Sequence, residues 1–394
     1  MGCRTLDELC ELIVDCPHSS AKDEGVGYPM VRTPNIGMGR LNLQGVHRVS
    51  RAVYEKRVAR AIPQANDLIL AREAPVGNVA IVPDGAQVCL GQRTMLLRPK
   101  TDEVVPSYLA YHLSAPEQRT RLLGMANGAT IAHINVADVR SFEVDLPPLC
   151  EQRRVAAVLQ SIDEKIEINS KLNGYLEELV ALEFERQFGA DCPTTELENV
   201  LDISTKALKP QEHTGEMWEH YSIPAFDGNH RPVVELADGI KSSKYVIDSD
   251  CILISKLNPS TKRVWLPACR TSNSVCSTEF IVYRPKVSKY RSFYFSVISS
   301  KAFTDYLLAH VSGSTGSRQR VQPKSTLGYP MPNPGAHAIE EYCEFADPLY
   351  KQMQLNEVSS QQLEKLRDTL LPKLMSGEVD VSKVDVTQLN SHLA

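Results

Sequence analysis

The sequence has no apolar run near the roughly 18 to 20 residues that a membrane-spanning helix needs. Its first residues, MGCRTLDELCELIVDC, lack the basic and then apolar order of a signal peptide. Its ten cysteines are scattered, with no C-x-x-C pair and no Cys/His cluster at zinc spacing. We therefore expect a cytoplasmic protein with reduced thiols, no bound metal and no membrane partner.

Motifs for catalysis are missing as well. The strings nearest to the (D/N/S)-P-P-(Y/F/W) motif of amino methyltransferases are LPPL and MPNP, which lack the acceptor and the aromatic ring. Neither G-x-x-x-x-G-K-(S/T) nor a complete dinucleotide loop is present. One acid-x-Lys triplet occurs, at Asp163, Glu164 and Lys165, and we interpret it as the solvated face of a helix. We expect a non-catalytic chain without a cofactor.

Charge is distributed unevenly, although the formal net charge is only −5. Residues 30–100 hold 11 Lys and Arg against 4 Asp and Glu, and residues 201–335 hold 17 against 11. Residues 146–200 hold 5 against 11, and residues 336–394 hold 5 against 10. Two basic regions thus alternate with two acidic ones. Because blocks of like charge are more often solvated faces than binding sites, this pattern alone does not establish a polyanionic ligand.

The two basic regions are similar to each other. VCLGQRTMLLRPK, which ends at Lys100, returns as VCSTEFIVYRPK, which ends at Lys286. DLILAREAPVGNVAIVP is echoed by CILISKLNPSTKRVWLP, and NGAT at Asn127 by SGST at Ser312, in the same order and at nearly the same spacing. Each copy contains short β-rich runs, turns of Gly, Pro and Asn, and then a helical stretch. The sequence therefore predicts two similar mixed α/β heads.

A long amphipathic helix follows each head. The first is predicted from Pro148 to about Phe188, and the second contains Pro348, which implies a kink or a helix that restarts there. Apolar residues and one asparagine recur in both at alternating steps of four and three, which is typical of a coiled-coil seam. The predicted seam consists of Leu159, Ile162, Ile166, Asn169, Leu176, Leu349, Met353, Asn356, Leu363 and Leu370.

The two stripes match in register, so that Asn169 corresponds to Asn356. Because a lone amphipathic helix is marginal in water, we expect the two helices to pair and to form a spacer of roughly 60 Å. A buried seam asparagine disfavours wrong registers at a cost in stability, whereas the alternative is that both asparagines are exposed. The predicted fold is α+β, with two similar heads separated by two long antiparallel coiled-coil helices.

The sequence also resembles a known family. LPPLCEQRRVAAVLQSIDEKIEINSKLN and LEKLRDTLLPKLMSGEVDV resemble the central and C-terminal segments of specificity subunits of type I restriction-modification systems. GYPMVRTPNIGMGRLN and GNVAIVP look like the framework of their target-recognition domains. The resemblance covers essentially the whole chain. Two departures are Cys150, at a place that is often acidic or polar, and IEEYCEF, which replaces the second EQ-like phrase.

The resemblance implies a non-enzymatic subunit in which each head reads one half of a bipartite site in double-stranded DNA. It implies recognition domains at residues 1–147 and 191–335, a central helix at 148–190 and a pairing C-terminal segment at 336–394. The implied partners are two methyltransferase subunits, which use S-adenosylmethionine, and restriction subunits that complete an ATP-dependent nuclease. An exposed helix surface at Val158, Leu179 and Leu182 is expected to need a partner to cover it.

The candidate DNA contacts are basic or polar side chains on turn-rich segments, because such groups read base edges and hold phosphates. In the first head they are Arg32, Asn35, Arg40, Arg48, Arg51, Arg72, Asn78, Gln92 and Arg93, with Thr130 and His133 in the loop GATIAHIN. In the second head they are Asn229, His230, Arg231, Lys241, Ser243, Lys244, Lys256, Asn258, Lys262 and Arg263, with Arg318, Gln319 and Arg320 in the loop SGSTGSRQR. For each residue taken singly, an exposed charge in solvent is the favoured explanation, and the residues are stronger candidates as a set.

Two other classes of function remain open. One is a stand-alone DNA-binding regulator with two heads, which needs no methyltransferase and is stable alone. The other is a scaffold whose acidic helices join two protein-binding domains without DNA. A steep loss of affinity with salt separates DNA readers from the scaffold.

Overall fold

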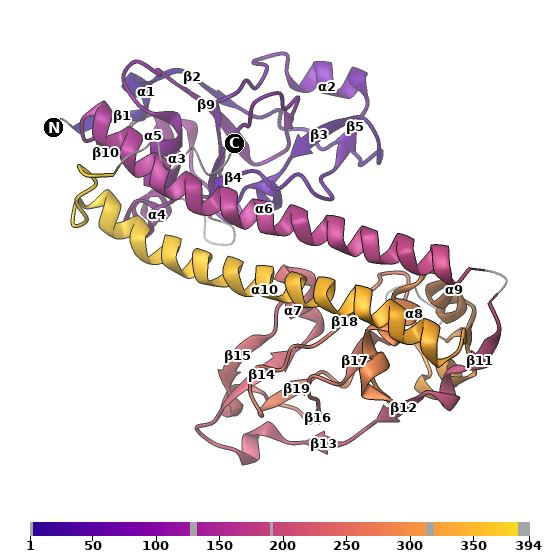
Figure 1. The fold of residues 1–394 in the computed structure, drawn as a ribbon. Coiled ribbons are helices and arrows are strands. Elements are labelled where there is room, and N and C mark those ends of the chain that lie inside the picture. Colours follow the sequence, from indigo (N-terminus) through magenta and orange to yellow (C-terminus); the bar gives the residue numbers. More distant parts are fainter. Residues whose placement is uncertain (1–2, 127–131, 190–191, 313–318, 385–394) are drawn as a thin grey trace. The chain divides into compact units, whose positions relative to one another are not determined.

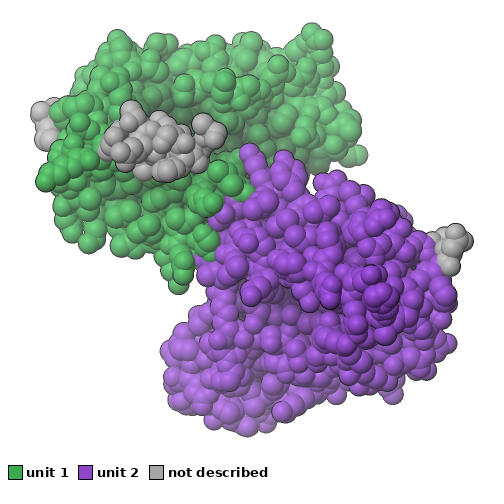
Figure 2. All heavy atoms as spheres, viewed as in Figure 1, with its two compact units in different colours: residues 1–168, 359–394 green, residues 169–358 purple. Residues whose placement is uncertain are grey.

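A computed structural model describes residues 3–126, 132–189, 192–312 and 319–384. The chain divides into two compact units, coloured separately in Figure 2. Unit 1 comprises Met1–Ile168 and Ser359–Ala394, and unit 2 comprises Asn169–Val358. Both boundaries fall inside long helices, α6 (Leu149–Gln187) and α10 (Ala336–Met375). Each unit therefore contains one head and part of both helices.

The head of unit 1 is built on a five-stranded sheet in the order β2-β9-β6-β7-β4, antiparallel except between β4 and β7. These strands are β2 (Cys10–Asp15), β9 (Thr94–Pro99), β6 (Leu68–Ala71), β7 (Val79–Ile81) and β4 (Gly39–Arg40). A smaller sheet has β3 (Tyr28–Val31) between β5 (Arg48–Val49) and β8 (Cys89–Leu90), and β1 (Cys3–Thr5) pairs with β10 (Glu143–Asp145). The helices of this head are α1 (Leu6–Leu9), α2 (Arg51–Arg57), α3 (Pro106–Ser114), α4 (Pro116–Gly124) and α5 (Val136–Arg140).

The head of unit 2 has a similar plan, but its two sheets have four and five strands where those of the first head have five and three. Its first sheet is β12 (Leu201–Ser204), β20 (Phe280–Pro285), β17 (Ile252–Ser255) and β18 (Val264–Trp265), in that order. Its second sheet is β13 (Ala207–Leu208), β16 (Lys244–Val246), β19 (Ser274–Cys276), β14 (Met217–Tyr221) and β15 (Val233–Leu236). The remaining elements are the pairs β11 (Thr194–Glu196) with β23 (Pro330–Pro332) and β21 (Val311–Ser312) with β22 (Arg320–Val321), and helices α7 (Ile223–Asn229), α8 (Arg291–Ser299) and α9 (Lys301–Ala309).

The predicted duplication is confirmed by the strand topology. β6 lies between β9 and β7, as β17 lies between β20 and β18, and β3 runs parallel to β8 as β14 runs parallel to β19. The order along the chain is also the same, since β9 is followed by α3 and α4 in the first head and β20 by α8 and α9 in the second. The repeated sequence therefore encodes the same arrangement of elements twice.

The β-rich runs of the sequence do not alternate cleanly between apolar and polar residues, because the central strands are buried on both faces. All four residues of β6 and all four of β17 are buried, because helices cover one face of each sheet and further strands and loops cover the other. The helices that cover them begin at residues suited to that place. Pro106 and Pro116 occupy first helical positions in α3 and α4, where a missing N–H has no cost, and the Ser300 hydroxyl accepts from Phe303 N–H at 3.1 Å at the start of α9.

The two long helices pack against each other within each unit, and they run antiparallel (Figure 1). In unit 1, Val155 and Leu159 of α6 share a core cluster with Leu371 and Leu374 of α10. The same cluster includes Tyr108 of α3, so the head and the helix pair have a common core. In unit 2, α6 and α10 share a cluster with α8 of the head through Phe184, Tyr342 and Phe293. The predicted fold class is confirmed.

The seam follows the predicted stripe. Leu159 and Ile162 are buried, and Ile166, Leu176, Leu349, Met353, Leu363 and Leu370 are partly buried. Asn169 is 3% exposed and Asn356 6%, so the interpretation of both as buried seam residues is confirmed and the exposed alternative is wrong. Asn356 Nδ2 donates to Asn173 Oδ1 at 2.8 Å, and Asn173 Nδ2 donates to the Met353 carbonyl at 3.1 Å. These bonds fix the register of the pair in unit 2.

Pro348 does not divide the second helix. α10 is one element of 40 residues that includes Pro348, so the alternative in which the helix restarts there is wrong. Neighbouring residues on this part of α10 are anchored in the core of unit 2, where Ala346 and Tyr350 are buried. Such packing offsets the loss of one backbone hydrogen bond.

Candidate nucleic-acid interface

In unit 2, two predicted loops meet at one place, which we call the second junction and define as Lys256–Asn258 with Gln319–Val321. The Asn258 N–H donates to the Gln319 carbonyl at 2.9 Å, and the Val321 N–H donates to the Lys256 carbonyl at 3.0 Å. Leu257 and Arg320 form an isolated antiparallel bridge. These backbone bonds bring four predicted contacts, Lys256, Asn258, Gln319 and Arg320, onto adjacent segments.

Unit 1 has the equivalent feature, the first junction, defined as Arg72–Ala74 with His133–Ile134. The Ile134 N–H donates to the Arg72 carbonyl at 3.1 Å, and Glu73 and His133 form the matching bridge. Ala74 and Asn258 hold the same unusual backbone conformation, with φ of 43° and 48°. The predicted correspondence between the loops containing His133 and Arg320 is therefore also seen in hydrogen bonds. Thr130 and Arg318, predicted within these loops, lie outside the described residues.

Most of the predicted arginines have a carboxylate partner. Arg72 is ion-paired with Asp15 at 2.6 Å and also donates to the Ile134 carbonyl at 2.8 Å, and its side chain is only 12% exposed. Arg263 forms a bidentate pair with Asp227, at 2.6 and 2.8 Å. Other pairs are Arg51 with Glu55, Arg93 with Glu73 and Arg320 with Glu279. Such partners reduce the positive charge that these positions offer to a phosphate.

Other predicted residues of the first head organise its own loops. Arg32 Nη2 lies 2.9 Å from His47 Nε2, and the Arg32 N–H donates to Asn35 Oδ1 at 3.0 Å. Arg48 donates to the Gly27 carbonyl at 2.7 Å, and Asn78 to the Ile36 carbonyl at 3.0 Å. These side chains determine the shape of the head. Gln92, by contrast, is exposed in the turn before β9.

Arg40 contacts the helix pair within unit 1. Its guanidinium pairs with Glu167 of α6 and lies 4.0 Å from Asp163 and 3.9 Å from Glu164. The interpretation of Asp163 as part of a solvated helix face is wrong, because Asp163 is 4% exposed and accepts hydrogen bonds from Tyr111 and Arg367. The apolar periodicity of the helix gave no signal for these contacts, which join residues 52 to 204 positions apart.

In the second head, three predicted lysines have no ion pair or side-chain hydrogen bond within the described residues: Lys241, Lys256 and Lys262. Ser243 is exposed near Lys241, and Asn229 is exposed at the end of α7, whereas Lys244 is buried and donates to Ser242 Oγ at 2.5 Å. His230 packs its ring 4.2 Å from that of Phe226, and Arg231 interacts electrostatically with Glu357 of α10. The second head thus offers unneutralised cations at its junction and on neighbouring turns.

Asn258 adds an unused acceptor to the second junction. Its Oδ1 atom is shielded from solvent and accepts no hydrogen bond within the described residues. A buried amide oxygen without a donor is uncommon and is usually satisfied by water or a ligand. The second junction therefore combines a free ammonium group with a free amide acceptor.

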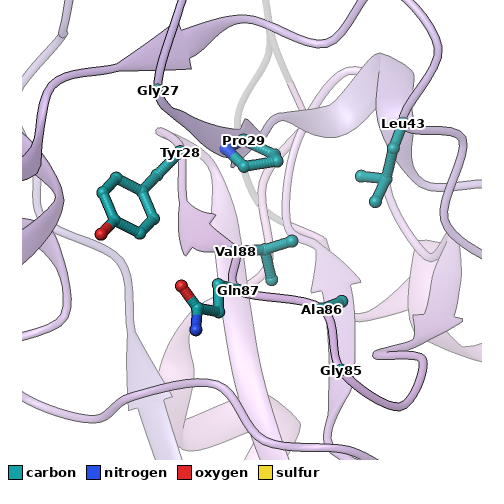
Figure 3. A pocket seen from close by; sticks show the side chains of 8 residues that line it. All are labelled: Gly27, Tyr28, Pro29, Leu43, Gly85, Ala86, Gln87 and Val88. Carbon is teal, nitrogen blue, oxygen red and sulfur yellow. The ribbon is translucent and has the colours of Figure 1, made fainter.

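An open hollow of about 450 Å³ lies in the first head beside β3 (Figure 3). Figure 3 shows Tyr28 and Gln87 toward one side of it and Leu43 toward the other. The ring of Tyr28 stacks on that of Tyr54 at 4.2 Å. No motif in the sequence predicts this hollow, because its walls come from separate segments of the chain.

A stripe of exposed apolar side chains follows α6 in unit 2, at steps of three and four residues. Its members are Leu172, Tyr175, Leu179 and Leu182, which are 38%, 68%, 47% and 58% exposed. The expectation that Leu179 and Leu182 are exposed is confirmed. Val158, expected on the same kind of surface, is instead partly buried against the core of unit 1. We call these four residues the α6 stripe.

Two absences concern only the part of the chain that the structure describes. Within it, no group of three or more His, Cys, Asp or Glu side chains is arranged to hold a metal ion. None of its helices combines the length and apolarity that crossing a bilayer requires.

Comparison with known proteins shows similarity to DNA specificity subunits of type I restriction systems. Residues 2–178 match the family described as type I restriction modification DNA specificity domain. The predicted resemblance of the chain to specificity subunits is therefore confirmed.

Relatives with curated names extend the match. The putative type I restriction enzyme MjaX specificity subunit of Methanocaldococcus jannaschii is 28% identical over 155 residues, which is 39% of this chain and 34% of that protein. The type I restriction enzyme MjaIX specificity subunit of the same organism is 22% identical over 377 residues, covering 86% of this chain and 84% of that one. The chain thus spans only about a third of the first relative and most of the second.

A solved structure has the same fold. The type I restriction-modification system S subunit from M. genitalium superimposes with a TM-score of 0.57 at 16% identity, covering 95% of each chain. At this identity the likeness concerns the fold alone.

Proposed function

We propose that this chain is the non-catalytic specificity subunit of a type I restriction-modification complex, in which each head reads one half of a bipartite site in double-stranded DNA. The observation that carries the proposal is the junction built twice, by equivalent backbone hydrogen bonds, in a chain whose residues 2–178 match a DNA specificity family. Two similar reading surfaces with different side chains suit two half-sites of different sequence.

The helix pair is proposed to set the spacer between the half-sites. α6 has 39 residues, which corresponds to about 58 Å of helix. Asn173 and Asn356 oppose sliding of one helix along the other, because a slipped register would leave their amides unpaired. A fixed register would give a fixed separation.

The proposed protein partners are two methyltransferase subunits, with restriction subunits added in the full complex. The α6 stripe supports the docking of a partner, because a periodic row of exposed leucines on a helix is typical of a surface that another protein covers. S-adenosylmethionine and ATP would then bind to the partners and not to this chain. Because such a complex acts on chromosomal DNA, we expect the protein in the cytoplasm.

The α6 stripe also favours this proposal over a stand-alone regulator, which would have no reason to expose it. The scaffold alternative makes no use of Lys256, which has no ion pair within the described residues of the second junction. A salt titration separates it from the DNA readings, since each neutralised phosphate contributes about −0.9 to the log-log slope of affinity against salt.

The test is selection of DNA from a library of randomised duplexes by the full-length chain, co-purified with the methyltransferase subunits of its host. We expect two conserved half-sites at one spacing, and we expect exchange of residues 1–147 for the head of a relative to change one half-site only. Insertion near residues 172–175 should change the spacing and leave both half-site sequences as they are. Selection of unrelated sequences, or a flat response to salt, would contradict the proposal.

A further inference from the structure

Resting on this proposed function, we infer that Asp163 is a positioning residue that holds the first head in one orientation on the helix pair and thereby narrows the choice of spacer. Asp163 belongs to α6 and is 4% exposed. Its Oδ2 atom accepts from the Tyr111 hydroxyl of α3 at 2.6 Å, and its Oδ1 atom accepts from Arg367 Nη1 of α10 at 2.8 Å. One carboxylate thus joins the head and both helices of unit 1.

A second residue of the head reaches the same place. Arg40 of β4 lies 4.0 Å from Asp163 through Nε, donates to the Gln160 carbonyl at 3.5 Å and pairs with Glu167. Its contacts therefore cover two turns of α6. The neighbouring Gly39 has φ of 74°, and a Cβ atom there would lie 2.9 Å from the Tyr111 ring, so only glycine lets β4 approach so closely.

We call the contacts of Asp163 with Tyr111 and Arg367 the joint of unit 1. The joint is directional because its two donors are held in place. The Arg367 guanidinium is planar and only 16% exposed, and charge-assisted hydrogen bonds are shorter and more specific in geometry than neutral ones. The pKa of the Tyr111 hydroxyl is raised well above its usual range, first by burial and then by the charge of Asp163, so the hydroxyl stays a donor. A different tilt of the head would move the Tyr111 hydroxyl away and leave the buried Oδ2 atom of Asp163 without its donor.

Unit 2 has a neutral joint at the equivalent position. Ser296 occupies the same place along α8 that Tyr111 occupies along α3, and its hydroxyl lies 2.7 Å from that of Tyr342 and 2.9 Å from that of Tyr350, both on α10. Hydroxyl groups can rotate and exchange donor and acceptor roles. The charged joint of unit 1 is therefore the more restrictive of the two.

Neither junction includes Asp163, Tyr111, Arg40 or Arg367, so the joint acts on where the first head is held and not on which bases it reads. A head that can tilt on its helices can reach half-sites at more than one separation. The measurable consequence is a loss of spacer preference with the half-site sequences retained.

The experiment uses the full-length chain with its methyltransferase subunits and a randomised duplex library, followed by binding to the selected site and to versions one base pair longer and shorter. Asp163→Asn should lower the preference for the selected spacer by about tenfold, equivalent to about 1.4 kcal/mol. Tyr111→Phe, which removes a single hydroxyl, should lower it less. Glu344→Gln is the matched control, because Glu344 is an exposed carboxylate on α10 with no ion pair within the described residues.

Thermal unfolding monitored by circular dichroism accompanies each variant, and if Asp163→Asn does not fold, Tyr111→Phe decides by the same measure. A folded variant that keeps the wild-type preference within about twofold overturns the inference. So does a variant that changes the first half-site sequence, since the residue would then act in reading. A wild-type complex that selects no bipartite site overturns the proposed function, and the inference with it.

Discussion

Lys256 of unit 2 occupies the position that Arg72 holds in unit 1, and among the described residues Arg72 has a carboxylate partner whereas Lys256 has none. Both residues accept through their carbonyl from the returning loop, from Ile134 in one head and from Val321 in the other. Asp15 pairs with Arg72 at 2.6 Å. In the second head the residue that corresponds to Asp15 is Thr205, which directly follows β12 and carries no charge. This position therefore holds an ion-paired arginine in the first head and, within the described residues, a lysine without an ion pair in the second.

Replacing Lys256 by Gln should remove one phosphate contact. We expect the slope of log affinity against log salt to become less steep by about 0.9, with no change in the half-site sequences. The measurement is fluorescence anisotropy on the selected duplex at several salt concentrations. Lys351→Gln is the control, since Lys351 is exposed on α10 with no ion pair within the described residues. Equal changes in the two variants would argue against a contact at Lys256.

Replacing Asn356 by Leu should destabilise unit 2 by about 1 to 3 kcal/mol, because Asn173 Oδ1 would lose its donor. The double variant Asn173→Leu/Asn356→Leu should recover much of that loss, since an apolar pair leaves no buried amide unpaired. Urea unfolding of the single and double variants gives the coupling directly. Losses that simply add would show that the two amides do not act as a pair.

Glu357 of α10 should make the stability of unit 2 depend on pH near neutrality. Burial raises the pKa of its carboxyl to about 7, although Arg231 and Arg270 lower it, and Glu177 adds to the rise. A folded pKa above the unfolded one means that stability is fully present below about pH 4.5 and is lost as pH rises toward 7, by on the order of 3 kcal/mol at most. Urea unfolding at pH 5 and pH 8 should show this loss, and Glu357→Gln should remove it. The same pH dependence in the variant would assign the effect to another group.

Replacing Leu179 and Leu182 by Ser should leave the isolated chain folded, because substitutions of exposed side chains change stability by about 0.5 kcal/mol or less. Co-purification of the methyltransferase subunits should fall at the same time, as the α6 stripe loses its apolar surface. Leu236→Ser is a suitable control, since Leu236 is an equally apolar side chain that is 50% exposed on β15 and belongs to neither α6 nor α10. Undiminished co-purification would place the partner elsewhere.

Much of the architecture follows from the sequence because the chain contains the same pattern twice. The first long helix was predicted from Pro148 to about Phe188 and spans Leu149–Gln187, and the seam asparagines were placed correctly. Periodicity reports which face of an element is buried, and it does so without knowledge of the partner.

Partners of charged side chains follow from no such pattern. Arg40, Arg72 and Arg263 all look like DNA contacts in the sequence, yet each faces a carboxylate that lies between 36 and 127 residues away along the chain. Asp163 shows the converse, since a carboxylate on an amphipathic helix reads as solvated until the residues that cover it are placed. Only the tertiary fold distinguishes a neutralised arginine from a free lysine.

The division of both long helices between the units has a consequence for how the chain can be shortened. The last part of α10 packs against Val155 and Leu159 in the core of unit 1. A chain that ends at Val358 would keep every residue of the first head but would lack the part of α10 that packs in the core of unit 1. In folding terms, unit 1 is finished only after α10, which follows the whole second head, has been synthesised.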